Sequence, residues 1–513
     1  MVEPIIHCSH VSKIFKEKKE SKAALSDISF FLPANAIIGL LGPDGSGKTT
    51  LLRLFAGLYR PTCGTIQVLG MDSVKNSEHL QSTLGYMPQK FGLYENLSVE
   101  ENMVLYAELH GLPKCEQEKR FTELLNLTSL TQFRQRMAGK LSGGMKQKLA
   151  LACSLVSNPP LLLLDEPTVG VDVLSRRELW KILRKLVNEG NTTVLASTSY
   201  IDEVSYCDRV LILHQGKLIS NSTPEELRQK AAPFIENPSF GNGFQILLSG
   251  KIHPRLSRKN PVKEDSPTII HAENIVKKFG DFTAVNRINF DVRRGEIFGL
   301  LGANGAGKTT TFRILCGLTT ANEGSIKIAG SDLHSRAAET RRKIGFVAQK
   351  FSLYTDLSVK NNLEFFGGAY GLAGKKLINR IEWALNAFSL RSYQNCITAK
   401  LPLGYKQRLS MACALLHEPE ILFLDEATSG ADPTARIEFW ERILDLADSG
   451  VTVIITTHYL DEAEYCDRMI IMQDGIAAAS GSISEILKQG NTIKLEEAFV
   501  NIICNFKRKQ GEL

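Results

Sequence analysis

Two copies of one glycine-rich loop constrain this chain more than any other feature of its sequence. They lie 260 positions apart in 513 residues and read Gly42-Pro43-Asp44-Gly45-Ser46-Gly47-Lys48-Thr49-Thr50 and Gly302-Ala303-Asn304-Gly305-Ala306-Gly307-Lys308-Thr309-Thr310. Each loop follows an apolar run (36–41 or 297–301) and precedes a helix-like stretch (50–58 or 310–318), which is the strand, loop and helix setting of a phosphate-binding loop. The sequence therefore predicts two nucleotide-binding domains.

The spacing within each loop predicts its chemistry. Glycines allow backbone N–H groups to close around phosphate oxygens, and the positive end of the following helix faces the same oxygens. Lys48 or Lys308 is expected to reach the terminal phosphates, and the hydroxyl of Thr49 or Thr309 can ligate Mg²⁺. A glycine-rich turn without this role would carry no Lys-Thr pair at the start of a helix. ATP and Mg²⁺ are therefore the expected ligands.

An Asp-Glu pair ends a strand-like run in each half. The runs are 161–164 and 421–424, which are apolar enough to be buried on both faces of a sheet. Asp165 and Asp425 are predicted to hold the Mg²⁺ shell, and Glu166 and Glu426 to polarise the attacking water. Acidic residues at a strand end are often only solvent-facing breaks. Both pairs, however, follow a phosphate-binding loop by about 120 residues, which favours the catalytic interpretation.

The repeat sets the expected domain organisation. Most paired residues differ by 260 positions, and one extra residue after Gly190 changes the offset to 259. We expect α/β domains at 1–226 and 268–513, each built around a mainly parallel sheet, because apolar strand-like runs alternate with helical patterns. Residues 227–267 carry five spaced prolines, which prevent a continuous helix. This segment is predicted to be a linker with one short strand at Phe244–Leu248.

Composition narrows the class of partner. The net charge of +6 suits ATP or anionic lipid headgroups but is weak for a protein that binds nucleic acid, so no nucleic-acid partner is expected. The ten cysteines show no CxxC spacing, which argues against a metal site or a disulfide scaffold. Residues 1–10 lack a signal pattern, and no run approaches 18 apolar residues. We expect a cytoplasmic protein that acts at a membrane only through a partner.

With these motifs in place, the chain resembles a tandem ABC-type ATPase over nearly all of its length except the linker. Gln89 and Gln349 look like the Q-loop, which in that family touches Mg²⁺ and the transmembrane partner. His458 matches the switch histidine, which in that family offers an imidazole N–H to the γ-phosphate. Phe15 and Phe279 stand where the family stacks an aromatic ring on adenine, although ordinary core packing would also explain two phenylalanines. The family signature is matched by Ser142, Gly143 and Gly144, which are expected to open a helix against the γ-phosphate held by the other domain.

The resemblance implies a fold and a function. Each half should be an ABC nucleotide-binding domain with a P-loop core, a helical subdomain and an antiparallel β subdomain. The phrases at 86–102 and 401–408 look most like the YbhF type, which pairs with ABC-2 permeases in bacterial efflux systems. This implies an ATPase subunit bound to two permease chains at the cytoplasmic face of the inner membrane. The alternatives are the fused ATPase of a sugar importer and a ribosome-associated translation factor, and the latter would carry a long charged helical linker.

Two departures from the family pattern fall together. Ser199 stands where the first half should have its switch histidine, and Pro402 and Leu403 replace the serine and a glycine of the second signature. Pro402 has neither a hydroxyl nor a backbone N–H, and Leu403 adds bulk near the expected phosphate. Domains of this family close head to tail, so the resemblance places both departures in one composite ATP site and leaves the other complete. The alternative is neutral drift, with both sites still hydrolysing ATP.

Overall fold

The computed structural model describes residues 4–17, 20–90, 92–190, 192–236, 238–250, 258–260, 262, 265–333, 337–349, 352–428 and 433–510. It contains two compact units, and the main division between them falls at Pro254 and Arg255, inside the predicted linker. No helix in these ranges is both long enough and apolar enough to cross a membrane.

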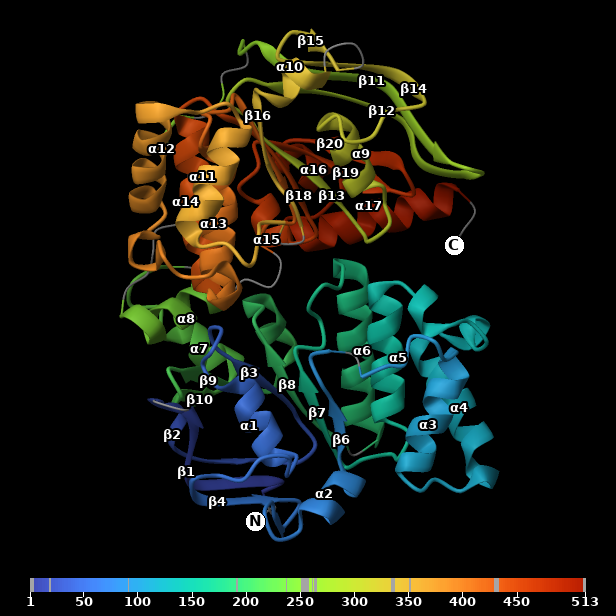
Figure 1. Ribbon diagram of the computed structural model, residues 1–513. Coiled ribbons are helices and arrows are strands. Elements are labelled where there is room, and N and C mark those ends of the chain that lie inside the picture. Colours follow the sequence, from blue (N-terminus) through green and yellow to red (C-terminus); the bar gives the residue numbers. More distant parts are fainter. Residues whose placement is uncertain are drawn as a thin grey trace. The chain divides into compact units, whose positions relative to one another are not determined.

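The first unit contains two sheets (Figure 1). A six-stranded sheet has the order β10-β9-β3-β8-β7-β6, in which β10 is antiparallel and the other strands are parallel, and a four-stranded antiparallel sheet has the order β2-β1-β4-β5. The strands are β1 (Ile6–Glu17), β2 (Glu20–Leu32), β3 (Ile37–Leu41), β4 (Cys63–Val68), β5 (Met71–Asp72), β6 (Gly85–Met87), β7 (Leu161–Asp165), β8 (Thr193–Thr198), β9 (Arg209–His214) and β10 (Lys217–Ser222).

In the described part of the first unit, one α-helix follows the glycine-rich loop, one precedes β6, four lie between β6 and β8, and two follow β10. They are α1 (Lys48–Phe55), α2 (Ser77–Thr83), α3 (Val99–Leu109), α4 (Lys114–Thr128), α5 (Gly143–Ser154), α6 (Val173–Gly190), α7 (Pro224–Gln229) and α8 (Phe240–Ser249). A parallel sheet with an attached helical group and a separate antiparallel sheet is the predicted architecture, so the fold prediction is confirmed.

The second unit repeats this topology, with sheet orders β16-β17-β18-β13-β19-β20 and β12-β11-β14-β15 (Figure 1). Its strands are β11 (Thr268–Phe279), β12 (Phe282–Arg293), β13 (Ile297–Gly302), β14 (Glu323–Ile328), β15 (Ser331–Asp332), β16 (Ile344–Val347), β17 (Ile421–Asp425), β18 (Thr452–Thr457), β19 (Arg468–Gln473) and β20 (Ile476–Gly481). Its helices are α9 (Lys308–Leu315), α10 (Ala337–Arg341), α11 (Val359–Ala369), α12 (Gly374–Ala387), α13 (Leu403–Leu415), α14 (Pro433–Asp448), α15 (Leu460–Ala463), α16 (Ile483–Gln489) and α17 (Leu495–Lys509).

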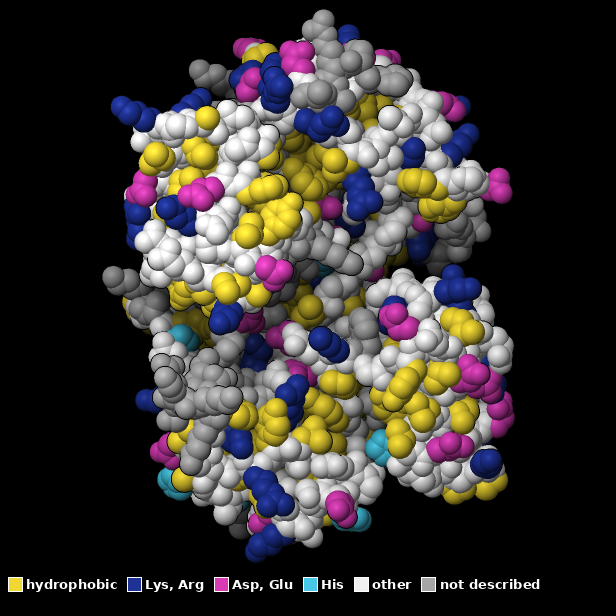
Figure 2. All heavy atoms as spheres, viewed as in Figure 1, with side chains coloured by type: hydrophobic (Ala, Val, Ile, Leu, Met, Phe, Trp, Pro, Cys, Tyr) yellow, Lys and Arg dark blue, Asp and Glu magenta, His cyan; other side chains and the backbone are white. Residues whose placement is uncertain are grey.

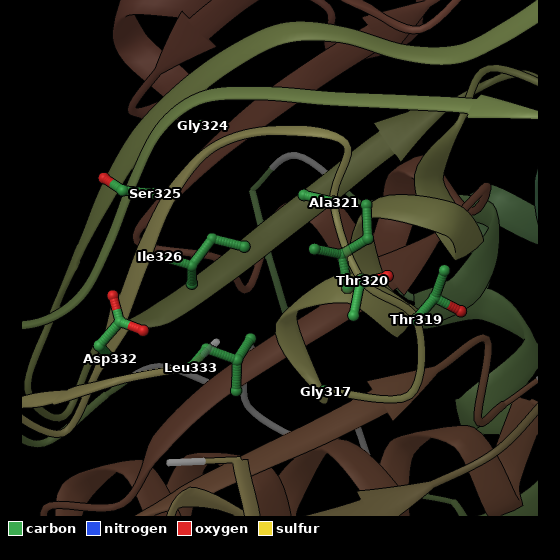
Figure 3. A pocket seen from close by; sticks show the side chains of 10 residues that line it. Gly317, Thr319, Thr320, Ala321, Gly324, Ser325, Ile326, Asp332 and Leu333 are labelled. Carbon is green, nitrogen blue, oxygen red and sulfur yellow. The ribbon is translucent and has the colours of Figure 1, made fainter. Parts of the chain in front are cut away.

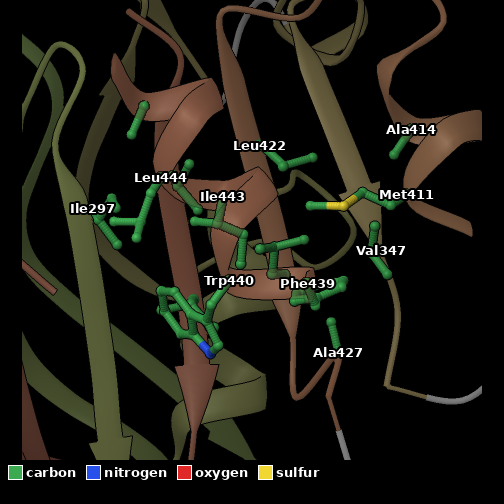
Figure 4. Packing of buried hydrophobic residues seen from close by; sticks show 14 of the residues in the cluster. Ile297, Val347, Met411, Ala414, Leu422, Ala427, Phe439, Trp440, Ile443 and Leu444 are labelled. Carbon is green, nitrogen blue, oxygen red and sulfur yellow. The ribbon is translucent and has the colours of Figure 1, made fainter. Parts of the chain in front are cut away.

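The all-apolar strands are buried on both faces, as predicted. Leu161 and Leu163 of β7 pack into the core beneath the antiparallel sheet, whereas Leu162 and Leu164 pack into the core beneath the helices. Successive side chains of a strand point to opposite faces, so a strand between two cores has no polar face. In the second unit, Leu422 of β17 belongs to one buried cluster with Phe439, Trp440 and Ile443 of α14 (Figure 4).

One secondary-structure prediction is wrong. The segment 244–248, predicted as a strand, belongs to helix α8. Ser239 caps this helix through a capping box with Asn242, and Phe244 is buried in the core of the first unit. Prolines at 238 and 254 leave room for a ten-residue helix between them, and burial of an apolar face stabilises it. The first part of the predicted linker is therefore part of the first unit.

The second part of the predicted linker is bound to the second unit through Arg258. The guanidinium lies 2.6 Å from an Oδ2 atom of Asp467 and 3.4 Å from an Oδ1 atom of Asp448, and all three side chains are largely buried. The same Asp467 oxygen accepts the backbone N–H of Ile297, the first residue of the strand that leads into the second glycine-rich loop. Arg258 is thereby connected to the base of that strand.

In the first unit, the equivalent aspartate pairs with an arginine from within the same unit. There Asp208 accepts the N–H of Ile37 and pairs with Arg184 of its own helix α6 at 2.9 Å. Leu444 stands at the equivalent position of α14, so the second unit has no arginine of its own there. The linker supplies the missing cation.

Replacing Arg258 by Ala should destabilise the second unit by about 3 kcal/mol, because it leaves two largely buried carboxylates without their cation. Hydrogen exchange of strand 297–302 should become faster, while strand 37–41 of the same molecule serves as an internal control. Arg184→Ala should reverse this pattern, with a smaller effect because its carboxylate partner is more exposed. Unchanged protection of 297–302 in the Arg258 variant would contradict the structural role of the linker.

Candidate functional site

Each glycine-rich loop joins the end of a central parallel strand to the start of a helix. The first runs from β3 to α1 and the second from β13 to α9. Gly47 and Gly307 precede the helices with φ of 105° and 97°. A Cβ atom on Gly47 would lie 2.7 Å from the carbonyl oxygen of Ala24, and one on Gly307 would lie 2.5 Å from that of Ala284. Only glycine fits both the dihedral angles and the available space.

The two loop lysines are buried over their own loops. Nζ of Lys48 donates to the carbonyl oxygens of Gly42 at 2.8 Å and Pro43 at 3.2 Å. Nζ of Lys308 donates to the corresponding oxygens of the second loop, at 2.7 and 2.9 Å. Burial lowers the pKa of Lys308, although the nearby carboxylates of Glu426 and Asp425 act in the opposite direction. An ammonium held in this way can turn to a phosphate that enters the loop.

The sheet order brings the strand-end carboxylates to these loops. β3, β8 and β7 are adjacent parallel strands, so their carboxyl ends meet at one edge. Thr49 donates its hydroxyl to Oδ1 of Asp165 at 3.1 Å, and Ser197 donates to the same oxygen at 2.7 Å. In the second unit, Thr456 donates to Oδ1 of Asp425 at 2.5 Å.

These groups fit Mg²⁺. The other carboxylate oxygen of Asp165, Oδ2, is buried and has no hydrogen-bond partner among the described residues. A hydroxyl and a carboxylate are the hard oxygen ligands that Mg²⁺ prefers. The described chain contains no cluster of three or more His, Cys, Asp and Glu residues placed to hold a metal. A cation held by one carboxylate, one hydroxyl and substrate phosphates needs no such cluster.

The two candidate bases occupy the same local geometry. Glu166 and Glu426 follow their strands with φ of 51° and 44°, a backbone region that is uncommon for glutamate. Oε2 of Glu166 accepts the side-chain N–H of Gln89 at 2.7 Å, and Oε2 of Glu426 accepts that of Gln349 at 2.6 Å. The structure thus brings each predicted Q-loop glutamine to its predicted base.

The two bases differ in their electrostatic surroundings. Nδ1 of His458 lies 3.3 Å from Oε2 of Glu426, whereas Ser199 stands at the equivalent position after β8. Burial raises the pKa of Glu166, and the charge of Lys48 only partly offsets it. Burial acts on Glu426 in the same direction, but His458, the charge of Lys308 and the hydrogen bond from Gln349 together lower its pKa below the usual value.

The two signature segments also differ. Ser142 caps helix α5 by accepting the backbone N–H of Met145 at 3.3 Å, and Gly143 and Gly144 form the first turn of this helix. Pro402 precedes helix α13 without any side-chain cap. The side chain of Leu403 lies outside the described part of the structure.

The two predicted adenine-stacking residues are at the ends of β1 and β11. Phe15 is 36% exposed and Phe279 is 54% exposed. A lysine ammonium lies near each ring, Lys13 at 5.1 Å and Lys277 at 5.2 Å from the ring centroid. This exposure contradicts the alternative of ordinary core packing.

Ser197 and Thr456 are site residues that the sequence interpretation missed. Each hydroxyl donates to the strand-end aspartate and accepts the backbone N–H of the following glutamate, at 2.8 Å for Glu166 and 3.0 Å for Glu426. Each hydroxyl therefore connects the carboxylate predicted to bind Mg²⁺ to the predicted base. The available signal was their equivalence in the repeat, two residues before Ser199 and His458.

A cavity of about 440 Å³ in the second unit is separate from these groups (Figure 3). It is lined by Ile314 and Gly317 at the carboxyl end of α9, by the following loop with Thr319, and by strands β14 and β15. The phosphate-binding loop lies at the opposite, amino-terminal end of α9. The cavity is therefore not the phosphate site.

A family model described as "ABC transporter" matches residues 25–169 and 285–429. Each match runs from before the glycine-rich loop to just beyond the Asp-Glu pair. The chain belongs to the ABC transporter family. Its two ABC domains bind and hydrolyse ATP, so the predicted ATPase activity is confirmed.

Relatives cover nearly the whole chain. It is 42% identical to "Probable multidrug ABC transporter ATP-binding protein YbhF" of Escherichia coli, over 96% of each chain. It is 28% identical to "Putative HMP/thiamine import ATP-binding protein YkoD" of Bacillus subtilis, over 93% of this chain and 91% of the relative. A solved ATP-binding subunit of an ABC transporter is 30% identical and covers 46% of this chain and 100% of its own, with a TM-score of 0.44. The predicted resemblance to tandem ABC ATPases of the YbhF type is confirmed.

Proposed function

We propose that this ABC protein is the ATP-hydrolysing subunit of a bacterial ABC-2 type exporter. It would bind two permease chains at the cytoplasmic face of the inner membrane and use ATP to drive multidrug or other efflux. The observation that carries this proposal is the pair of loop, Asp and Glu centres in a chain with 42% identity to a probable multidrug transporter subunit. ABC ATP-binding subunits work with transmembrane permeases, and the ABC-2 type of the partner and the number of its chains are parts of the proposal.

Hydrolysis follows from the chain's own groups. The loop lysines would leave the loop carbonyls to bind the terminal phosphates, while Thr309 and Asp425 would hold Mg²⁺, which neutralises charge on those phosphates. Glu426 would accept a proton from the attacking water as the water oxygen bonds to the γ-phosphorus and the bond to ADP breaks. Gln349 donates a hydrogen bond to the Glu426 carboxylate, and His458 lies 3.3 Å from the same oxygen, so both neighbours position the base.

The proposal includes one complete and one degenerate ATP site. Glu166 lacks the histidine that lowers the pKa of Glu426, and Pro402 lacks the hydroxyl cap of Ser142. Loss of one preorganised donor of this kind typically costs about 2.7 to 4 kcal/mol in the transition state, or roughly 10² to 10³ in rate. In the head-to-tail arrangement implied by the family resemblance, both defects belong to the site of the first glycine-rich loop. That site would bind ATP but hydrolyse it slowly.

The loops after Gln89 and Gln349 are proposed to contact the permease. Tyr94 is 59% exposed and Tyr354 is 49% exposed. A buried asparagine, Asn102 or Asn362, accepts the tyrosine backbone N–H at 2.9 or 3.0 Å and donates to its carbonyl oxygen, which fixes the backbone of each tyrosine.

The second of these surfaces is strongly aromatic. The ring of Tyr354 packs edge to face against that of Phe365, which is itself 48% exposed, with 4.7 Å between ring centroids. Figure 2 shows apolar side chains gathered on the second unit near helix α11, which carries Phe365. A contiguous exposed apolar surface favours a protein partner.

Two alternatives predict different partners. An importer would work with a periplasmic binding protein, and the import-named relative shares only 28% identity. A ribosome-associated factor would carry a long charged helix between its domains. The described part of 230–267 instead contains the ten-residue helix α8, which packs on the first unit. Two membrane proteins encoded beside the gene would support the exporter, and a periplasmic sugar-binding protein would support import.

Glu426→Gln should abolish nearly all ATP turnover, because it removes the base of the complete site, whereas Glu166→Gln should leave most of it. The steady-state ATPase rates of both variants are measured with the permease present. ATP binding serves as the control and should persist in both. Equal losses of turnover would exclude the one-site model, since two coupled competent sites would explain them better.

Phe15→Ala and Phe279→Ala should each weaken ATP binding by about 1 to 3 kcal/mol, which is the contribution of one stacked aromatic ring per base. Equilibrium titration with ATP gives the affinity. Phe31→Ala, which removes an exposed ring from β2, is the matched control and should have no effect. If both test variants bind ATP as the parent does, these rings do not stack on adenine.

Replacing Tyr94 and Tyr354 by Ala should reduce recovery of the permease in co-purification. The substitutions remove the exposed apolar surface that the permease is proposed to cover. ATP affinity should stay unchanged, because neither tyrosine is among the residues predicted to bind the phosphates or the adenine. The Phe31→Ala variant again controls for general loss of surface aromatics. Normal recovery of the complex would show that the permease binds elsewhere.

A further inference from the structure

The ring of Phe15 is supported by a second aromatic residue. Tyr59, in the loop after α1, packs edge to face against Phe15 with 5.6 Å between ring centroids and 75° between ring planes. The hydroxyl of Tyr59 accepts a hydrogen bond from Arg53 of α1 at 2.9 Å. The ammonium of Lys13 lies 5.1 Å from one ring and 5.6 Å from the other. Phe15 is thus part of a connected cluster that is anchored on the helix following the glycine-rich loop.

The second unit has the same framework without the second ring. Thr319 stands at the position of Tyr59, and Arg313 stands at that of Arg53 and is exposed. The lysine geometry is preserved: Lys277 donates to the carbonyl oxygen of Thr320 at 2.7 Å, as Lys13 does to that of Arg60 at 2.8 Å. The second half lacks this ring, and Phe279 is more exposed than Phe15.

A phenylalanine ring that already packs against another ring loses less conformational entropy when it stacks on a base than a ring without such a contact does. Packing on Tyr59 restricts the rotamers of Phe15 before any ligand binds, whereas Phe279 must be ordered by the ligand itself. Preorganisation of this kind mainly slows dissociation.

We propose that Tyr59, anchored by Arg53, positions Phe15 so that the first half retains an adenine nucleotide longer than the second half. The inference rests on the proposed function, in which Phe15 and Phe279 stack on adenine. In this proposal, the packing of Tyr59 against Phe15 slows nucleotide release from the site that hydrolyses ATP slowly. The faster-releasing site is then the one with the complete catalytic set.

The test uses the full chain with one loop disabled at a time. The probe is a fluorescent ATP analogue labelled on the ribose. In the Lys308→Ala variant it reports binding at the first loop, and in the Lys48→Ala variant it reports binding at the second loop. Its dissociation rate is measured by displacement with excess ATP. Tyr59→Thr, which copies the second half, should speed release from the first loop by about 2- to 10-fold, the effect expected from loss of one aromatic pair. Thr319→Tyr should slow release from the second loop by a similar factor, because Arg313 is available as its hydrogen-bond donor.

Two further measurements separate positioning from general damage. Tyr59→Phe keeps the ring but loses the bond from Arg53, so its release rate should lie between those of the parent and Tyr59→Thr. Binding of inorganic tripolyphosphate, which has no base, should be the same in all these variants. Weaker tripolyphosphate binding in Tyr59→Thr would overturn the proposal, because it would indicate a disturbed phosphate loop.

The outcomes also distinguish the positioning role of Tyr59 from the proposed stacking of Phe15 on adenine. If Phe15→Ala leaves ATP release unchanged, adenine stacking at this residue is wrong and the positioning role fails with it. If Phe15→Ala speeds release while Tyr59→Thr does not, the stacking assignment stands and only the role of Tyr59 is overturned.

Discussion

The meeting of a buried ammonium with buried strand-end carboxylates is the interaction on which each ATP centre depends. In the first unit, Nζ of Lys48 lies 3.6 Å from Oε1 of Glu166, and both side chains are almost fully buried. Such charges are tolerated away from water only when they are paired and hydrogen-bonded. The pairing requires that the loop after β3 and the end of β7 lie at one edge, which the parallel order β3-β8-β7 provides. The two cores on either face of the sheet hold that edge in place.

Because the chain is a repeat, its two units can be compared with each other. The two units share sheet order, loop geometry and the contact between glutamine and base, so their few differences stand out against a constant background. The second unit has His458 beside its base, and the first has Tyr59 beside its aromatic platform. The two proposals agree in direction. In the proposals, the first half holds its nucleotide longer, and the second half has the complete set of catalytic groups.

Motif-based expectations succeeded where the chemistry is local and failed where burial decides. The glycine-rich loops, the buried strands and the Asp-Glu pairs all lie where they were predicted. The short strand at 244–248 was wrong, because an apolar run between prolines fits a strand or a helix equally well until its packing partner is known. Ser197 and Thr456 carried no motif, and only their position beside the strand-end aspartates gives them a role.

The sequence by itself determined that this chain is a tandem ABC ATPase and which residues form its two phosphate loops. Those features depend on dihedral angles, spacing and residue chemistry within a few consecutive positions. The tertiary structure alone decided which distant groups come into contact: Ser197 with Asp165, Arg258 with Asp467, and Tyr59 with Phe15. These contacts join segments between about 30 and 210 residues apart, so they exist only because strand order and helix packing bring the segments together.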